Sequence, residues 1–309
     1  MRLSSTSAPG ITERWPEIPY AAWRETMDTL HMELQVIGKL RLALSPFEPQ
    51  WGNVALYLTA RGLTTSPMSA SGVNFEVEAD LLHHEVLLQT ASGATKRVAL
   101  TARPVAVFYK ELMEALNSLG INVDVSRRPS EVDNPIPFDE DYTHSAYDHI
   151  AVTRFFHALS DVDLVLKEHR AHFRGRSSLV HFFWGTFDLV LTRFSGRPAT
   201  PPKDAGTIYR LSTDAEQICV GFWPGNPRFP EPAFFGYAYP KPPGIEEVPV
   251  RPAAARWDAK LGEFVLPYHE VRKAPSPKKA ILEFCESVYE AGAGLAAWDP
   301  GLVIARQPV

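Results

Sequence analysis

A chain of 309 residues, 45% hydrophobic and 22% charged, has a globular composition and is long enough to bury a sizeable core. Its net charge of −5 supplies no basic field to hold a nucleic-acid backbone, so no nucleic-acid partner is expected. Cys219 and Cys285 are too few for a disulfide framework or a cysteine-based zinc site. With no signal peptide and no apolar run long enough to cross a bilayer, the sequence predicts a soluble, cytoplasmic protein without a membrane partner. The sequence does not determine the oligomeric state.

The first half of the chain begins with a helix predicted over residues 18–43, where apolar residues recur on one stripe at helical spacing. A strand is predicted from Trp51 to Arg61, because side chains alternate between two faces there. "VNFEVEAD" and "EVLLQT" form a hairpin across the polar corner at residues 82–84, and "ATKRVAL" extends the sheet. A second helix opens at Pro104, where a first helical turn tolerates proline.

Residues 128–146 form a linker rich in proline and acidic residues, without periodicity. A second long helix follows, for which Ser145 is the expected N-cap with Asp148 at the third helical position. The stretch "HFFWGTFDLVL" then predicts one strand. Residues 197–252 form an insertion that holds twelve of the 27 prolines, with strands at "ICVGFWPG" and "AFFGYAYP". Because proline cannot donate to a ladder, these strands are expected at a sheet edge.

Four collinear segment pairs suggest that the chain is a tandem duplication. The pairs, in chain order, are 29–41 with 158–170, 51–63 with 184–196, 80–88 with 258–266, and 104–116 with 277–289. The second pair aligns Trp51 with Trp184. The predicted fold class is therefore α+β, with pseudo-symmetric copies at 15–127 and 147–300 that each run helix, antiparallel sheet, helix.

Several long motifs carry a family resemblance: "LHMELQVIGKLRLALSP", "LYLTARGLTTSP", "PIPFDED", "HFFWGTFDLVLTRFSGR" and "GFWPG". With them the chain resembles a bacterial family catalogued only as a domain of unknown function. The resemblance covers the chain from about Trp15 to Trp298. It implies one coherent unit and brings no activity, cofactor or catalytic residue.

The densest polar segment, residues 139–149, offers oxygen and imidazole ligands of the kind that a divalent metal needs. Its candidate ligands are Asp139, Glu140, Asp141, His144, Asp148 and His149. Their spacing matches no metal motif, and acidic residues suit a helix N-terminus, so capping is the favoured role and no metal is predicted.

A basic segment near the end of the second long helix could bind phosphate or carboxylate groups. It contains Lys167, His169, Arg170, His172, Arg174 and Arg176. Without a glycine-rich loop, the favoured role of these cations is to complement the helix C-terminus. His181 falls on the apolar strand face, where a hydrogen-bonded core histidine is the simpler interpretation.

Thirteen aromatic side chains fall between Phe182 and Tyr239, more than one strand face needs for its core. The strand faces turned away from the helices mix aromatic and polar residues, as a mostly apolar pocket does. The predicted ligand contacts are Trp51, Tyr57, Arg61, Trp184, Asp188 and Trp223. The same faces suit the packing of one half on the other, which the sequence favours slightly.

Two functional classes follow. The first is a small-molecule-binding protein with an aromatic-lined pocket between the two repeats, which takes a small, partly aromatic or anionic ligand. The alternative is an enzyme, metal-assisted or hydrolase-like, that uses residues 139–149 or the pair Asp188 and His181 for acid/base chemistry. An interaction module is a third class. The sequence identifies neither the ligand nor a cofactor.

Overall fold

The computed structural model describes residues 14–304 as an α+β protein with two antiparallel sheets. Its helices are α1 (Tyr20–Leu44), α2 (Val105–Ser118), α3 (His149–Ala171), α4 (Thr207–Ser212), α5 (Tyr268–Lys273) and α6 (Pro277–Leu295), with 3-10 turns η1 (Pro49–Trp51), η2 (Phe138–Glu140), η3 (Ile245–Glu247) and η4 (Pro300–Leu302). The strands of the first sheet are β1 (Tyr57–Leu58), β2 (Gly62–Thr64), β3 (Met68–Ala70), β4 (Val73–Asp80), β5 (Glu85–Thr90) and β6 (Thr95–Ala99). Those of the second are β7 (His181–Phe183), β8 (Asp188–Pro198), β9 (Ala215–Trp223), β10 (Ala233–Tyr239), β11 (Arg256–Asp258) and β12 (Glu263–Pro267).

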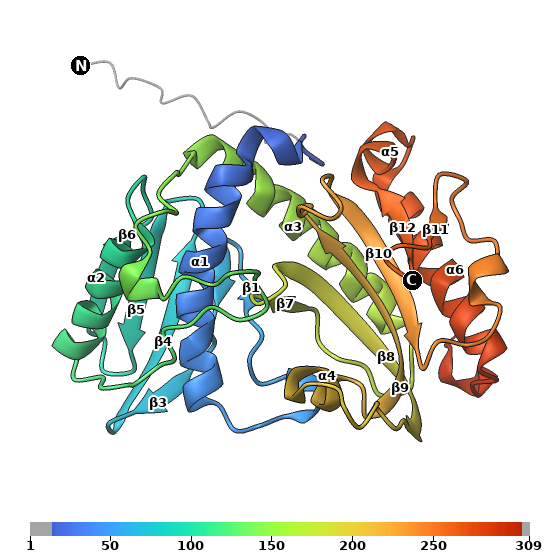
Figure 1. The fold of residues 1–309 in the computed structure, drawn as a ribbon, viewed down its shortest axis with the longest axis horizontal. Coiled ribbons are helices and arrows are strands. Elements are labelled where there is room, and N and C mark those ends of the chain that lie inside the picture. Colours follow the sequence, from blue (N-terminus) through green and yellow to red (C-terminus); the bar gives the residue numbers. More distant parts are fainter. Residues whose placement is uncertain (1–13, 305–309) are drawn as a thin grey trace, which may run out of the picture.

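The two sheets lie side by side, with the helices distributed over both (Figure 1). The first has the strand order β1-β2-β4-β5-β6, with β3 paired to β4, and the second has the order β11-β12-β10-β9-β8-β7. They meet where Leu56 and Phe182 exchange backbone hydrogen bonds of 3.0 Å. Helices α1 and α2 pack against the first sheet, and α3, α5 and α6 against the second.

The central helix α1 buries the predicted apolar stripe and, in its second half, polar residues on its other sides as well. Every residue from 32 to 41 is buried, including Glu33, Gln35 and Lys39. The connecting segment before α3 crosses the helix, since Ser130 accepts a 2.7 Å hydrogen bond from Lys39 Nζ and its backbone N–H donates to Gln35 Oε1 over 2.8 Å. Because this segment covers the outer side of α1, the polar residues on that side are also buried.

The prediction of a strand from Trp51 to Arg61 is wrong for most of these residues. Gln50 and Trp51 have positive φ angles of 55° and 59°, which no extended strand allows, and Trp51 ends the turn η1. Only Tyr57–Leu58 pair as a strand. The alternation of side chains in this segment arises because its residues pack in a turn and a short strand, not because they form one continuous strand.

The stretch "HFFWGTFDLVL" is a hairpin, not one strand. Residues 184–187 form a turn between β7 and β8, and Phe187, with φ 61°, has the left-handed conformation that closes it. His84 and Gly262 have φ 55° and 74° at the same position of the β4–β5 and β11–β12 turns. Trp184 therefore lies in a turn, a different element from that of Trp51.

Ser145 is not the cap of the second long helix. The helix α3 begins at His149, and the Asp148 carboxylate accepts hydrogen bonds from the N–H groups of Ile150 and Ala151 at 2.8 and 3.2 Å. A carboxylate directly before the first helical residue satisfies two free amides, whereas Ser145 lies three residues too early.

The strands predicted within residues 197–252 form, as β9 and β10, but not at an edge. They are inner strands of the second sheet, between β8 and β12. None of the prolines of this region lies inside β9 or β10, so both strands keep their ladder donors. The segment is thus an integral part of the second sheet.

Candidate functional site

One face of the second sheet, which we call the open face, meets helix α4 at its end, where Tyr209 contacts Tyr239, and the contacts among the described residues place no helix over its middle. Val288 of α6 lies against Gly236 on the helical side, whereas the ring of Phe235 lies over Gly221 on the opposite side. Since strand side chains alternate and paired residues share a face, the register identifies the other members. The open face contains Phe183, Asp188, Val190, Thr192, Cys219, Trp223, Phe235, Tyr237, Glu263 and Val265.

A row of aromatic rings crosses this face. The rings of Trp223 and Phe235 are stacked, with centroids 4.7 Å apart and planes 18° apart, and the Phe235 and Tyr237 planes differ by 12°. Phe229 meets Trp223 edge-on at 5.7 Å. A Cβ at Gly221 would lie 2.4 Å from the Phe235 ring, so glycine lets that ring lie flat on the strand. Trp223 and Tyr237 remain partly exposed.

Two carboxyl groups accompany the rings. Burial is the main reason that the pKa of Asp188 is raised to about 7. A hydrogen bond from Thr186 lowers this pKa, and the charge of Glu131 raises it. Burial, and then the charge of Asp188, raise the pKa of Glu263 to about 7. Both carboxyls therefore change charge near neutral pH, and a cation bound beside them would stabilise their ionised forms.

Cys219 lies among these groups as a buried thiol. Burial raises its pKa to about 11, and its sulfur lies 3.3 Å from the Thr192 hydroxyl. Its proximity, together with burial, raises the pKa of Tyr237 well above the ordinary value. A protonated, buried thiol of this kind is a poor nucleophile, and Cys285 is buried in the same way, with its pKa raised to about 12.

Tyr57 connects the first half of the chain to the open face. Its ring meets that of His181 edge-on at 5.7 Å, and His181 contacts Phe183 at 5.3 Å. The guanidinium of Arg41 lies 5.5 Å from the Tyr57 ring, and its Nε atom is buried without a hydrogen-bond partner among the described residues. Burial lowers the pKa of His181 to about 4, so this core histidine is neutral.

The other predicted ligand contacts lie elsewhere. Trp51 donates its indole N–H to the carbonyl oxygen of Ile208 over 3.0 Å, which attaches α4 to the turn η1. Arg61 lies in the polar network described below. Trp184 is only 4% exposed and packs between the halves. Of the six predicted residues, Asp188 and Trp223 share the open face and Tyr57 adjoins it.

The acidic and histidine-rich segment does not gather around one point. Asp139 pairs with Arg127 at 2.7 Å, and Asp141 pairs with His144 at 2.6 Å and accepts two backbone N–H groups. Asp148 caps α3. Within residues 14–304, no group of three or more His, Cys, Asp or Glu is placed to hold a metal ion.

The basic segment is likewise divided among structural partners. Lys167 pairs with Asp163 at 2.5 Å, and Arg170 donates to the carbonyl oxygen of Ser178 at 2.7 Å. His169 lies 2.9 Å from Glu286, which also faces the buried Arg193. Burial lowers the pKa of His169 to about 4. Periodicity could not predict this network, since Arg193 and Glu286 are almost a hundred residues apart.

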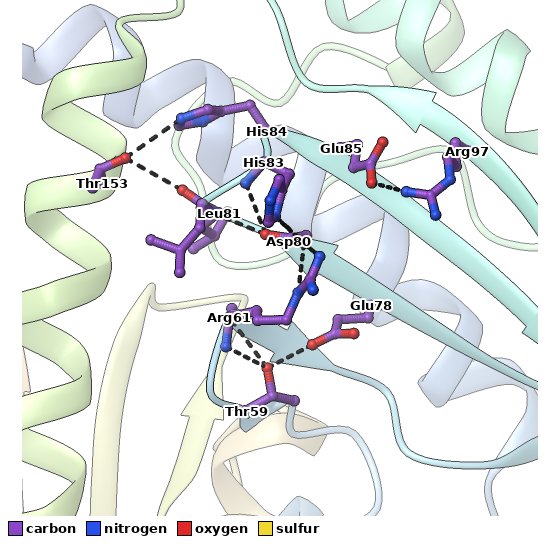
Figure 2. Close-up of polar contacts among 12 residues, drawn as sticks. Thr59, Arg61, Glu78, Asp80, Leu81, His83, His84, Glu85, Arg97 and Thr153 are labelled. Atoms are coloured by element: carbon purple, nitrogen blue, oxygen red, sulfur yellow. Dashed lines mark hydrogen bonds and ion pairs between the residues drawn. The ribbon is translucent and has the colours of Figure 1, made fainter. Parts of the chain in front are cut away.

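A second polar network surrounds the buried carboxylate of Asp80 at the β4–β5 turn (Figure 2). Its oxygens accept hydrogen bonds from the backbone N–H groups of Leu82 and His83 at 3.0 and 2.8 Å, and from the guanidinium of Arg61. The imidazole of His83 lies 3.0 Å away. Arg61 is thus an ion-pair partner that stabilises a turn.

Two surface hollows lie away from the open face. One, of about 220 Å³, separates the ends of β9 and β10 from the last turns of α6. The other, of about 250 Å³, is lined by His84, His149, Ile150, Thr153 and Arg154. The sequence placed His84 at the polar corner of the first hairpin and His149 in the acidic segment, and did not predict that they meet.

These features define an α+β protein with two adjoining antiparallel sheets and a partly exposed row of aromatic rings on the open face. The chain belongs to a family of unknown function, DUF5996, whose model matches residues 15–304, which confirms the resemblance drawn from the sequence. No curated protein and no solved structure matches the chain. In the part of the chain that the structure describes, no helix has the length and apolar character to span a membrane.

Proposed function

We propose that this protein binds a small molecule on the open face of its second sheet. The observation that carries the proposal is the row of nearly parallel rings at Trp223, Phe235 and Tyr237, beside carboxyl groups at Asp188 and Glu263. Flat rings bury apolar ligand surface, and a few polar groups orient the ligand. No helix of the described chain packs on these rings, which supports a role beyond the core.

The charges of this face favour a ligand with a flat apolar part and an amine or another cationic group. The register places the acidic residues Asp188, Asp258 and Glu263 and the basic residue Arg256 on this face, and Glu131 lies nearby, so an anionic ligand would meet mainly like charges. A cation would gain from the carboxylates and from the aromatic faces together. We therefore favour a cation over the anionic ligand considered from sequence.

The enzyme alternative has weaker support. Asp188 and His181 lie on the same side of the second sheet, but no hydrogen bond joins them among the described contacts. An acid/base pair needs the two groups within hydrogen-bond reach of each other or of one substrate proton. The arrangement of rings and carboxyls thus supports binding more directly than catalysis.

We also propose that the two halves are pseudo-symmetric repeats. Each runs from a long helix through an antiparallel sheet to a helix that opens directly after or at a proline, Pro104 and Pro277. The paired segments 80–88 and 258–266 both contain a four-residue turn closed by a positive φ. The pairing of Trp51 with Trp184 does not support the proposal, because the two lie in different elements.

Calorimetric titration with tryptamine and with indole-3-propionate tests the binding proposal, because the two probes share a ring and differ in charge. We expect tryptamine alone to bind, and more tightly at pH 8 than at pH 6, because Asp188 and Glu263 ionise near pH 7. Asp188→Asn should weaken binding about tenfold, the effect of one charge-assisted hydrogen bond.

Asp204→Asn is the matched control, since Asp204 is an exposed aspartate of the same second half. It should leave the affinity for tryptamine unchanged. Binding of neither probe, equal binding of both, or equal losses in the two variants would each contradict the proposed site.

A further inference from the structure

The hollow of about 250 Å³ lies between the β4–β5 turn and the first two turns of α3. The rings of His84 and His149 meet edge-on there, with centroids 4.2 Å apart. The Thr153 hydroxyl lies 3.4 Å from His84 Nε2 and 3.5 Å from the carbonyl oxygen of Leu81, as Figure 2 shows. Side chains far apart in the sequence thus bring two imidazoles and a hydroxyl to one concave surface.

His84 is held in a fixed orientation. Its Nδ1 atom lies 3.2 Å from the hydroxyl of the buried Tyr147, so Nε2 is the ring nitrogen on the side of Thr153. Tyr147 also contacts the His149 ring edge-on at 5.2 Å. The buried Tyr147 therefore contacts both imidazoles.

The residues that line this hollow include basic side chains and no acidic one. Arg154 is exposed and forms no ion pair among residues 14–304. Two acids beside the hollow already have partners: Asp148 accepts the N–H groups of Ile150 and Ala151, and Asp80 pairs with Arg61. Since these two N–H groups at the start of α3 already donate to Asp148, a ligand in the hollow must be bound by side chains.

The charge of a protonated His149 destabilises the charged form of His84. Burial lowers the pKa of His84, and the charges of His149 and then His83 lower it further, against the opposing charge of Asp80. A bound anion would remove this repulsion by neutralising the protonated rings. The same anion would give Arg154 the partner that it lacks.

We propose that this hollow binds a phosphate group, held by His84, His149, Thr153 and Arg154. A phosphate offers acceptor oxygens in several directions, which suits donors that surround a concave surface, and arginine binds it through two parallel hydrogen bonds. The group can be inorganic phosphate or the phosphate of a monoester, because the donors contact only its oxygens. This site is independent of the open face and of the ligand proposed there.

Titration of the 309-residue chain with inorganic phosphate, followed through the histidine ring resonances in NMR spectra, tests the proposal. Phosphate should shift the ring resonances of His84 and His149 and raise the titration midpoint of His84, while the resonance of His269, exposed on α5, stays unchanged. Arg154→Gln should weaken phosphate binding about tenfold, as expected for the loss of a charged donor. Thr153→Val should weaken it less, because it removes a neutral donor.

Arg174→Gln is the matched control, because Arg174 is another exposed arginine just beyond the end of the same helix. Its phosphate affinity should equal that of the unchanged protein. A parallel titration with glycerol 3-phosphate separates the sources: tighter binding than inorganic phosphate indicates a monoester, and equal binding indicates the free ion. Unshifted His84 and His149 resonances, or equal losses in the Arg154 and Arg174 variants, would overturn the proposal.

Discussion

Trp184 donates its indole N–H to the backbone carbonyl oxygen of Val54 over 2.8 Å, which links the second half of the chain to the first. Its ring covers Gly38 of α1, where a Cβ would lie 2.3 Å from the ring atoms. Lys39 Nζ lies 5.4 Å from the centroid of the same ring. These contacts are those of a residue that packs the halves together.

Trp184→Ala should therefore lower the free energy of unfolding by about 3–5 kcal/mol, the usual effect of truncating a buried aromatic residue. Gly38→Ala should also destabilise the protein, because its new methyl group meets the indole. In the double variant the methyl group occupies space that the indole leaves, so Gly38→Ala should destabilise less there. Denaturant unfolding of the four proteins measures this coupling; additive losses would contradict the contact.

The cap of α3 gives a second prediction. Asp148→Ala should lower stability by about 1 kcal/mol, because two helical N–H groups lose their acceptor. Ser145→Ala should be close to neutral, since Ser145 lies outside the helix. Thermal unfolding of both variants decides between the two residues, and a larger loss for Ser145→Ala would restore the sequence-based cap.

Glu33 predicts a pH dependence of stability. It is fully buried in α1, both carboxylate oxygens lack hydrogen-bond partners among the described residues, and burial raises its pKa to about 8 against the charge of Arg103. In the unfolded chain the same carboxyl ionises near pH 4.5. Between these values the folded state holds a proton that the unfolded state has released, so stability falls as pH rises.

The contribution should reach at most about 1.4 kcal/mol per pH unit and end near pH 8, where the folded carboxyl also ionises. Glu33→Gln keeps the size of the side chain and removes the titration, so its stability should fall less between pH 5 and pH 8. Unfolding by urea across this range provides the measurement. Identical slopes for the two proteins would show that Glu33 does not titrate there.

Two aspartates at equivalent turn positions form a matched pair. Asp80 and Asp258 each accept hydrogen bonds from the N–H groups two and three residues later, but only Asp80 also pairs with Arg61. Burial alone would raise the pKa of Asp80, yet hydrogen bonds from His83, Arg61 and Leu82 lower it, so the carboxylate stays charged. Asp80→Ala should lower stability by about 2–3 kcal/mol and Asp258→Ala by about 1 kcal/mol. Equal losses would mean that the ion pair contributes nothing.

Residues close in sequence were predicted best. Apolar spacing predicted the helix that became α1, Pro104 predicted the start of α2, and the turn at residues 81–84 followed from a polar corner between alternating segments. The composition of the segment around Phe235 indicated that rings would gather there. In each case the physical cause, a helical or strand period of burial, repeats within a few residues.

The relationships that shape the candidate sites depend on distant residues. Whether a tryptophan faces a ligand or a neighbouring helix depends on what lies opposite: Trp184 meets Gly38 and becomes core, while Trp223 stacks on Phe235 and remains partly exposed. His84 and His149 are adjacent only because the β4–β5 turn packs on the start of α3. Periodicity along the chain determines which side of an element is apolar, and only tertiary packing decides which of those sides become covered.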